Sequence, residues 1–282
     1  MEVKDFKTIG QQIDLLKKRG CYIEDESHAK KVLSTVNYYR LSSYFLPFKQ
    51  VDNTYIKGTT FDKVYQNYIF DRKFRNLISY LIEGIEVSLK TLIAYHHSSK
   101  FGSLGYLDAN NYNDKFDEKV FKDNMAKYIG RNSKHPVILH HEANYGGKYP
   151  FWVIIEFYNF GDLSKLFSQL PTSIQKNIAK DLNLNYSIVS SWLYCLTHLR
   201  NSCAHYSRLY NTKMISIPKT PLGYSIKLDK SIFSYMLVLK ELTVNSSDWH
   251  DFREKLKLLI SKFGASIDIS RLGFPSNWET HI

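Results

Sequence analysis

The feature that most constrains the fold is a long stretch without helix breakers. Between Phe61 and His97 the sequence has no proline and one glycine, Gly84. Apolar residues recur there at helical spacing, so the stretch predicts one helix much longer than the average globular helix. Because that length is unusual in a globular protein, a break near Phe70 and Asp71 would be unsurprising.

Helical periodicity continues through most of the remaining chain, where glycine and proline mark the ends of segments. Further helices are predicted at about 9–19, 26–36, 119–129, 151–160, 162–170, 172–182, 186–209, 231–244 and 248–263. Residues 215–228 alternate around Pro-Leu-Gly, which favours one small β-hairpin. The fold class is therefore all-α. We expect a helical and aromatic N-terminal segment, 1–58, followed by a helical domain, 59–282.

Charge and cysteine usage limit the classes of partner and compartment. Lysine and arginine number 38 against 27 acidic residues, a net charge of +11, which fits either a polyanionic partner or an inert basic surface. Cys21, Cys195 and Cys203 form no Cys-x-x-Cys pair, so neither a disulfide framework nor a zinc site is indicated. The charged first twelve residues resemble no signal peptide, and no apolar run has membrane-spanning length. A cytoplasmic protein with no membrane partner is expected.

Residues 191–211 carry the most informative pattern, because two faces of one helix can be read from them. The first face is apolar and predicts a core-facing seam. It consists of Trp192, Leu196, Leu199, Cys203 and Tyr206. The second face is polar and consists of His198, Asn201, His205 and Arg208. Arg200 lies about 100° from this polar face.

This polar face suits phosphodiester chemistry. An arginine binds phosphate oxygens through its forked guanidinium, and a histidine titrates near neutral pH. A histidine can therefore take a proton from a 2′-hydroxyl group or give one to a leaving oxygen. Residues 191–211 contain no carboxylate, which weakens a two-metal mechanism, and we predict no metal or other cofactor. Arginine and histidine are also ordinary surface residues of helices, so spacing alone leaves both interpretations open.

The string from Leu199 to Asn211 adds a family resemblance to this pattern. Arg200 and His205 are separated by four residues, and Asn201 follows the arginine. This motif resembles that of HEPN ribonucleases, and the longer string resembles abortive-infection (Abi) proteins of the AbiD and AbiF type. Other segments match the family in order: 15–20, 37–44, 47–48, 70–72, 85–86, 150–156, 160–161, 273–275 and 277–278. Residues 100–148 and 212–245 match no motif of the family.

The resemblance implies a HEPN-type helical bundle that works as a homodimer, with two Arg–His motifs meeting in one composite site. It further implies RNA cleavage in anti-phage defence and, for AbiF-like members, a small non-coding RNA that binds and restrains the protein. Arg200, His205 and Asn201 are then the expected catalytic residues. The expected accessory residues are Arg208, Glu156 and His198. Arg208 is expected to add a phosphate contact. Glu156 is expected either to orient the Arg–His pair or to form a structural salt bridge.

The aromatic and basic segment near the N-terminus is a candidate RNA-binding element. Tyr38, Tyr39, Arg40 and Tyr44 could contact unpaired bases and phosphates, or the tyrosines could pack at the edge of the core. A non-catalytic RNA-binding HEPN protein and a phage-sensing interaction factor remain alternatives to a nuclease. Cleavage of labelled RNA in EDTA distinguishes them.

Overall fold

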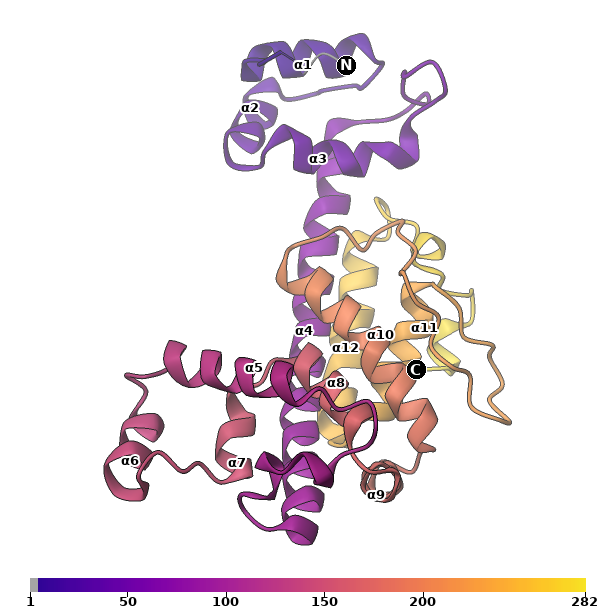
Figure 1. The fold of residues 1–282 in the computed structure, drawn as a ribbon. Coiled ribbons are helices and arrows are strands. Elements are labelled where there is room, and N and C mark those ends of the chain that lie inside the picture. The colour runs from indigo at the N-terminus through magenta and orange to yellow at the C-terminus, as the bar shows by residue number, and fades with distance from the viewer. Residues whose placement is uncertain (1–4) are drawn as a thin grey trace. The chain divides into compact units, whose positions relative to one another are not determined.

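The computed structural model describes residues 5–282, and residues 1–4, which belong to the charged N-terminal stretch, lie outside it. The described residues form twelve α-helices and six short 3-10 helices, without a β-strand, which confirms the all-α prediction (Figure 1). The helices are α1 (Ile9–Lys18), α2 (Glu26–Thr35), α3 (Tyr38–Phe45), α4 (Phe61–Phe101), α5 (Glu118–Arg131), α6 (Pro136–Tyr145), α7 (Phe151–Ile154), α8 (Phe160–Gln169), α9 (Thr172–Asp181), α10 (Tyr186–Ala204), α11 (Ile232–Leu242) and α12 (Ser246–Phe263). No described helix is long and apolar enough to cross a membrane.

The chain forms two compact units, each assembled from segments that are distant in sequence. The first contains the described residues up to Ile78, together with Ser202–Lys213 and His250–His281. The second contains Ser79–Asn201 and Met214–Trp249. The predicted boundary between residues 58 and 59 lies inside the first unit.

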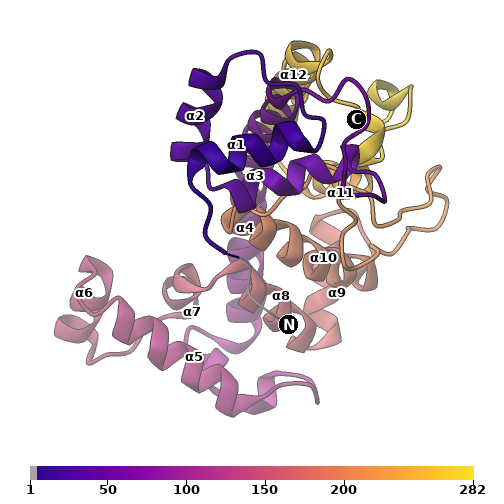
Figure 2. The ribbon, with the colours of Figure 1, turned by 90° about the horizontal axis from the view of Figure 1, so that it is seen from above.

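In the first unit, α1 packs against α2, and α3 lies beside these two helices (Figures 1 and 2). Helix α1 begins with a capping box in which Thr8 and Gln11 exchange side-chain and backbone hydrogen bonds. Deeper in the unit, the ring of Phe70 contacts the rings of Tyr210 and Phe263 at centroid distances of 6.3 and 5.9 Å. These contacts join α4, the segment after α10 and α12 in one core.

The second unit has an aromatic core. The rings of Tyr106 and Phe151 stack with centroids 5.0 Å apart, and the Tyr106 hydroxyl donates to the carbonyl of Tyr149. Trp192 of α10 is fully buried and donates its indole N–H to the carbonyl of Lys219 at 2.8 Å.

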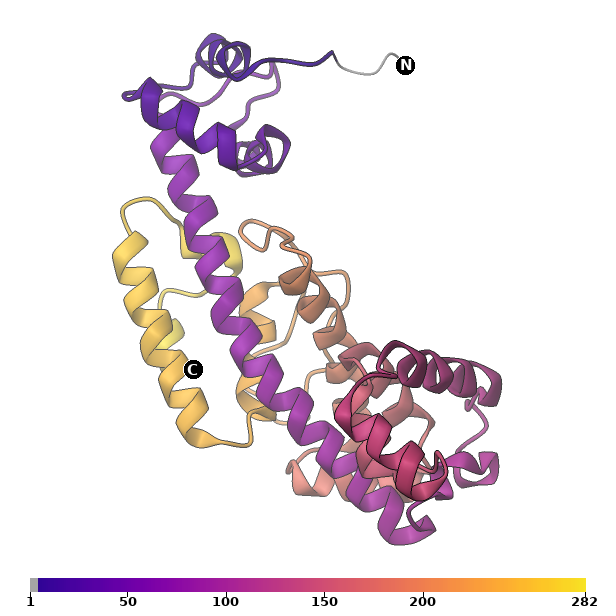
Figure 3. The same ribbon diagram turned by 90° about the vertical axis from the view of Figure 1, so that its left-hand side faces the viewer.

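Helix α4 runs through 41 residues without interruption (Figure 3), so the expected break near Phe70 and Asp71 was wrong. Phe70, Phe74 and Ile78 are all fully buried at four-residue spacing. Asp71 pairs with a residue one helical turn away, which stabilises the same stretch. The buried side chains therefore stabilise a continuous helix at the point where its unusual length had suggested a break.

The predicted hairpin at residues 215–228 was also wrong, since this described segment contains no strand. Pro218 and Pro221 lack the N–H groups that a β-ladder requires. The segment is fixed to the core by other contacts. Besides the bond from Trp192 to Lys219, the Tyr235 hydroxyl donates to the carbonyl of Ser216 at 2.9 Å.

Candidate functional site at the end of helix α10

The Arg–His motif lies where α10 ends, and this end differs from the prediction. The helix stops at Ala204 rather than near Leu209. The N–H of Ser207 donates to the carbonyl of Ser202, and the N–H of Tyr206 donates to that of Cys203, at 2.8 and 3.2 Å. This pair of bonds is a Schellman motif, in which the residue after the C-cap adopts a left-handed conformation. His205 is therefore the C-cap residue.

Tyr206 occupies the left-handed position, with a φ of 58°. That position usually holds glycine, and a bulky side chain there is strained. Tyr206 was predicted to complete the apolar seam, but it is 66% exposed, so this part of the prediction was wrong. The rest of the seam is confirmed, because Trp192, Leu196, Leu199 and Cys203 are all buried.

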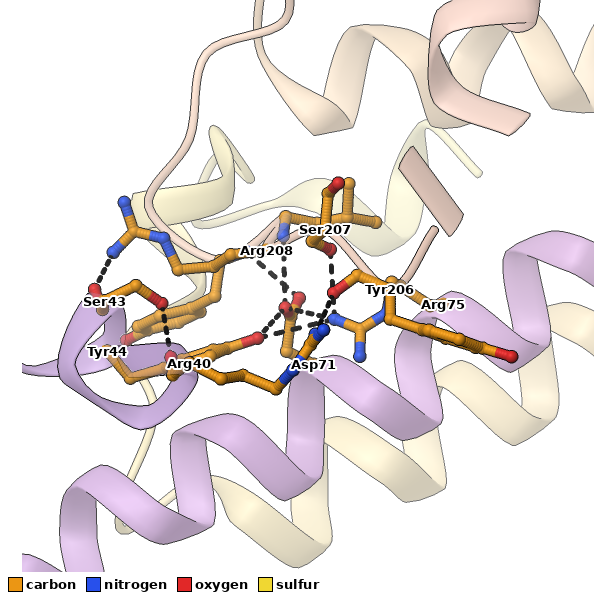
Figure 4. Close-up of polar contacts among 10 residues, drawn as sticks. Arg40, Ser43, Tyr44, Asp71, Arg75, Tyr206, Ser207 and Arg208 are labelled. Carbon is orange, nitrogen blue, oxygen red and sulfur yellow. Dashed lines mark hydrogen bonds and ion pairs between the residues drawn. The ribbon is translucent and has the colours of Figure 1, made fainter. Parts of the chain in front are cut away.

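The turn after His205 is held by a buried carboxylate, Asp71 of α4 (Figure 4). Asp71 is fully buried and accepts hydrogen bonds from the Tyr44 hydroxyl and an Arg75 N–H, both at 2.6 Å. It also accepts from the backbone N–H groups of Leu209 and Tyr210, at 3.1 and 3.0 Å. One carboxylate thus joins α3, α4 and the segment that follows the motif.

Two arginines hold the carbonyl groups of the same turn. Arg75 donates to the carbonyl of Ser207 at 3.2 Å, and Arg40 donates to that of Tyr206 at 2.7 Å (Figure 4). Bonds from charged donors are stronger than those between neutral groups. The two residues that directly follow His205 therefore have fixed backbone positions.

The electrostatics of this cluster follow from burial and pairing. Burial raises the pKa of Asp71, while the Arg75 guanidinium, the Tyr44 hydroxyl and the two backbone N–H groups oppose that shift. Burial, followed by the nearby Asp71 carboxylate, raises the pKa of the Tyr44 hydroxyl. The paired charges and complete hydrogen bonding are what a buried carboxylate requires.

The expected catalytic side chains are accessible. His205 and Asn201 are exposed, and Arg200 is half-buried. Within the described part of the chain, no hydrogen bond or ion pair engages the Arg200 guanidinium or the His205 ring. These side chains remain available for a substrate.

Arg208, expected on the polar helix face as a phosphate contact, lies beyond the helix end instead. Its guanidinium donates to the carbonyl of Ser43 in α3 (Figure 4). Burial lowers the pKa of Arg208, and the nearby Tyr44 and Asp71 oppose that effect. This bond fastens the turn after the motif to α3, and the phosphate contact stays a prediction.

Glu156, expected to orient the Arg–His pair, is paired elsewhere. Its carboxylate lies 4.0 Å from the Lys90 ammonium group, which also donates to its backbone carbonyl at 2.9 Å. No ion pair joins Arg200 to any described carboxylate. Glu156 instead lines a cavity of about 470 Å³ together with Lys90 and Trp152.

His198, the third accessory residue, is half-buried, and its ring meets that of Tyr194 edge-on at 4.9 Å. Its Nε2 atom is buried and has no hydrogen-bond partner within the described chain. His198 therefore packs against an aromatic ring and lacks the polar surroundings expected of a proton-transfer group.

The four residues of the expected RNA-binding segment have different surroundings. Tyr39 is 85% exposed and can stack on a base. Tyr38 is half-buried with a buried hydroxyl, and Arg40 is engaged with the carbonyl of Tyr206. Tyr44 is 2% exposed, so the stacking role expected for it is corrected to a role within the core.

Side chains that could bind a metal ion or form a disulfide do not cluster in the described structure. No group of three His, Cys, Asp or Glu side chains in residues 5–282 could hold a metal ion. Cys21, Cys195 and Cys203 are all buried, and burial raises the pKa of Cys21 to about 12.

The fold and site define an all-helical protein with an Arg-x4-His motif at the end of an internal helix. The family model of Abi-like proteins matches residues 31–211, from α2 to the end of the motif string. The chain belongs to this Abi-like family, which indicates a role in abortive-infection defence. No curated protein and no solved structure matches the chain.

Proposed function

We propose that the protein is a metal-independent HEPN endoribonuclease of the AbiD/AbiF type. It acts as a toxin in cytoplasmic anti-phage defence and is restrained by a cognate small non-coding RNA. The observation that carries the proposal is the contrast at the end of α10. Arg200 and His205 have no protein partner in the described chain, whereas the turn directly after His205 is fixed by Asp71, Arg75 and Arg40.

The proposed reaction is an attack by the 2′-hydroxyl group of RNA on the adjacent phosphorus atom. One His205 takes the proton of that hydroxyl, and a second His205 protonates the leaving 5′-oxygen. Arg200 stabilises the charged phosphorane, and Asn201 positions His205. Cleavage leaves a 2′,3′-cyclic phosphate and a 5′-hydroxyl group.

This mechanism calls for a symmetric homodimer. One chain supplies one imidazole in its motif, while the reaction benefits from both an acid and a base. A two-fold axis that brings two motifs together supplies both groups. We therefore expect light scattering to give the mass of a dimer, and a monomer that still cleaves RNA would contradict the mechanism.

RNA binding is supported by the net charge of +11 and by exposed aromatic rings such as that of Tyr39. Because most of the affinity should come from lysine and arginine contacts with phosphates, it should fall steeply as salt rises. Binding that is absent, or that is insensitive to salt, would contradict this part of the proposal.

The proposal is tested by cleavage of labelled RNA by the full chain. His205→Ala should lose roughly 10²–10⁴-fold in rate, as expected for loss of general acid–base catalysis. Arg200→Ala should lose on the order of 10²–10³-fold, as expected for loss of one electrostatic stabiliser. Both variants should still bind RNA, since other basic residues contact phosphates. RNA binding without cleavage by the wild-type protein would favour a non-catalytic RNA-binding module, and full activity in His205→Ala would contradict the proposed chemistry.

A further inference from the structure

Tyr206 combines three features that folding alone does not explain. Its backbone is left-handed with a φ of 58°, its side chain is 66% exposed, and it directly follows His205. Glycine would form the same turn without strain, because it has no Cβ atom. The chain therefore carries a bulky ring at a position where the ring makes the turn harder to form.

The Tyr206 side chain gains little from the protein in return. No hydrogen bond of its hydroxyl occurs within the described chain, and its ring points away from the polar cluster around Asp71 (Figure 4). Strained backbone that the surrounding structure enforces is a feature of functional sites. Here the enforcement is visible, because Arg40 holds the carbonyl of Tyr206 and Arg75 holds that of Ser207.

We propose that the Tyr206 ring is a substrate-binding platform that stacks on an unpaired base of RNA beside the bond that His205 acts on. The inference rests on the proposed function and adds a specificity determinant to it. An exposed aromatic ring stacks on any base but cannot reach one that is paired within a helix. Tyr206 would thus direct cleavage to single-stranded RNA and hold the nucleotide in place for attack.

The test uses full-length variants in a His205→Ala background, so that binding is measured without cleavage. The probe is a short unpaired RNA that contains 2-aminopurine, whose fluorescence is quenched by stacking. Tyr206→Gly keeps the left-handed turn and removes the ring, whereas Tyr206→Phe keeps the ring and removes the hydroxyl. Tyr22→Ala removes a ring of similar exposure, 62%, elsewhere in the first unit.

Tyr206→Gly should weaken binding about fivefold to a hundredfold, as expected for one lost base stack, and should remove the quenching. Tyr206→Phe and Tyr22→Ala should bind like the His205→Ala parent. With His205 intact, Tyr206→Gly should also lose its preference for unpaired over double-stranded RNA.

Unchanged binding and quenching in Tyr206→Gly would overturn the inference, and so would a changed oligomeric state without RNA, since the ring would then contact protein. Failure of the proposed function looks different. If the wild-type protein never cleaves RNA but Tyr206→Gly still weakens binding, the platform stands and the nuclease proposal fails.

Discussion

Helix α4 places a completely buried titratable side chain in each unit, namely Asp71 in the first and His97 in the second. The surroundings of these two side chains differ. In the first unit, the Asp71 carboxylate accepts four hydrogen bonds and pairs with Arg75. In the second unit, His97 lies among Phe101, Tyr112 and Phe151, with ring centroids 4.9 to 5.4 Å away. Neither nitrogen of the His97 ring has a hydrogen-bond partner within the described chain.

The difference shows that burial of a titratable group does not by itself mark a functional site. His97 packs as a neutral aromatic ring, and burial lowers its pKa to about 4. Asp71 instead connects the segment after the Arg–His motif to two other helices. Its importance lies in the backbone groups that it binds, namely the N–H groups of Leu209 and Tyr210.

Removing the Asp71 charge should have the largest effect on stability. Asp71→Asn introduces an amide that cannot pair with the Arg75 cation or accept hydrogen bonds at both positions. Breaking a buried ion pair of this kind costs about 3–5 kcal/mol in the free energy of unfolding, measured in urea. Glu83→Gln, on an exposed position of the same helix, is the control and should stay within about 0.5 kcal/mol. A loss below about 1 kcal/mol in Asp71→Asn would mean that the cluster does not fasten the turn.

His97 should make stability fall as the pH is lowered. Its ordinary pKa is 6.5 and its folded pKa is about 4, so below pH 6.5 the unfolded chain binds a proton that the folded chain does not. Between pH 7.5 and pH 5 this difference should remove about 2 kcal/mol of stability.

The variant His97→Phe should lack this contribution, because phenylalanine suits the aromatic surroundings and does not titrate. His140→Phe, on an exposed position, is the matched control and should retain the wild-type pH dependence. An equal pH dependence in wild type and His97→Phe would indicate that His97 finds polar partners in solution.

Arg40→Ala should change stability least, by about 1 kcal/mol or less, because the arginine is exposed and water can replace its bond to Tyr206. Its effect on RNA cleavage should be larger, about tenfold, since small displacements of a catalytic group are costly. Arg40→Lys keeps the charge and should recover part of the rate. If the loss of cleavage rate, converted to free energy, is no larger than the loss in the free energy of unfolding, Arg40 has a purely structural role.

The sequence was most informative where periodicity alone determines structure. The buried seam of Trp192, Leu196 and Leu199 follows directly from helical spacing. Helix α4 begins at Phe61, where the predicted stretch without helix breakers begins, and the Thr60 side chain caps it. The exposed positions of Asn201 and His205 were also consistent with the predicted polar face.

The end of α10 could not be predicted, because contacts that are distant in sequence determine it. Local propensity gives no reason for Tyr206 to adopt a left-handed backbone. Asp71, Arg75 and Arg40 impose the turn from positions more than a hundred residues away. The family resemblance drew attention to the segment at Asp71, but only the structure connects this carboxylate to the backbone after His205.

The most direct test of the central claim, that the Arg–His motif cleaves RNA through its 2′-hydroxyl group, is analysis of the product ends. Wild-type protein in EDTA should convert RNA to fragments with 2′,3′-cyclic phosphate and 5′-hydroxyl ends, and should leave DNA of the same sequence intact. Cleavage of the DNA, or 5′-phosphate products that disappear in EDTA, would contradict this chemistry and point to a metal-activated water as the nucleophile.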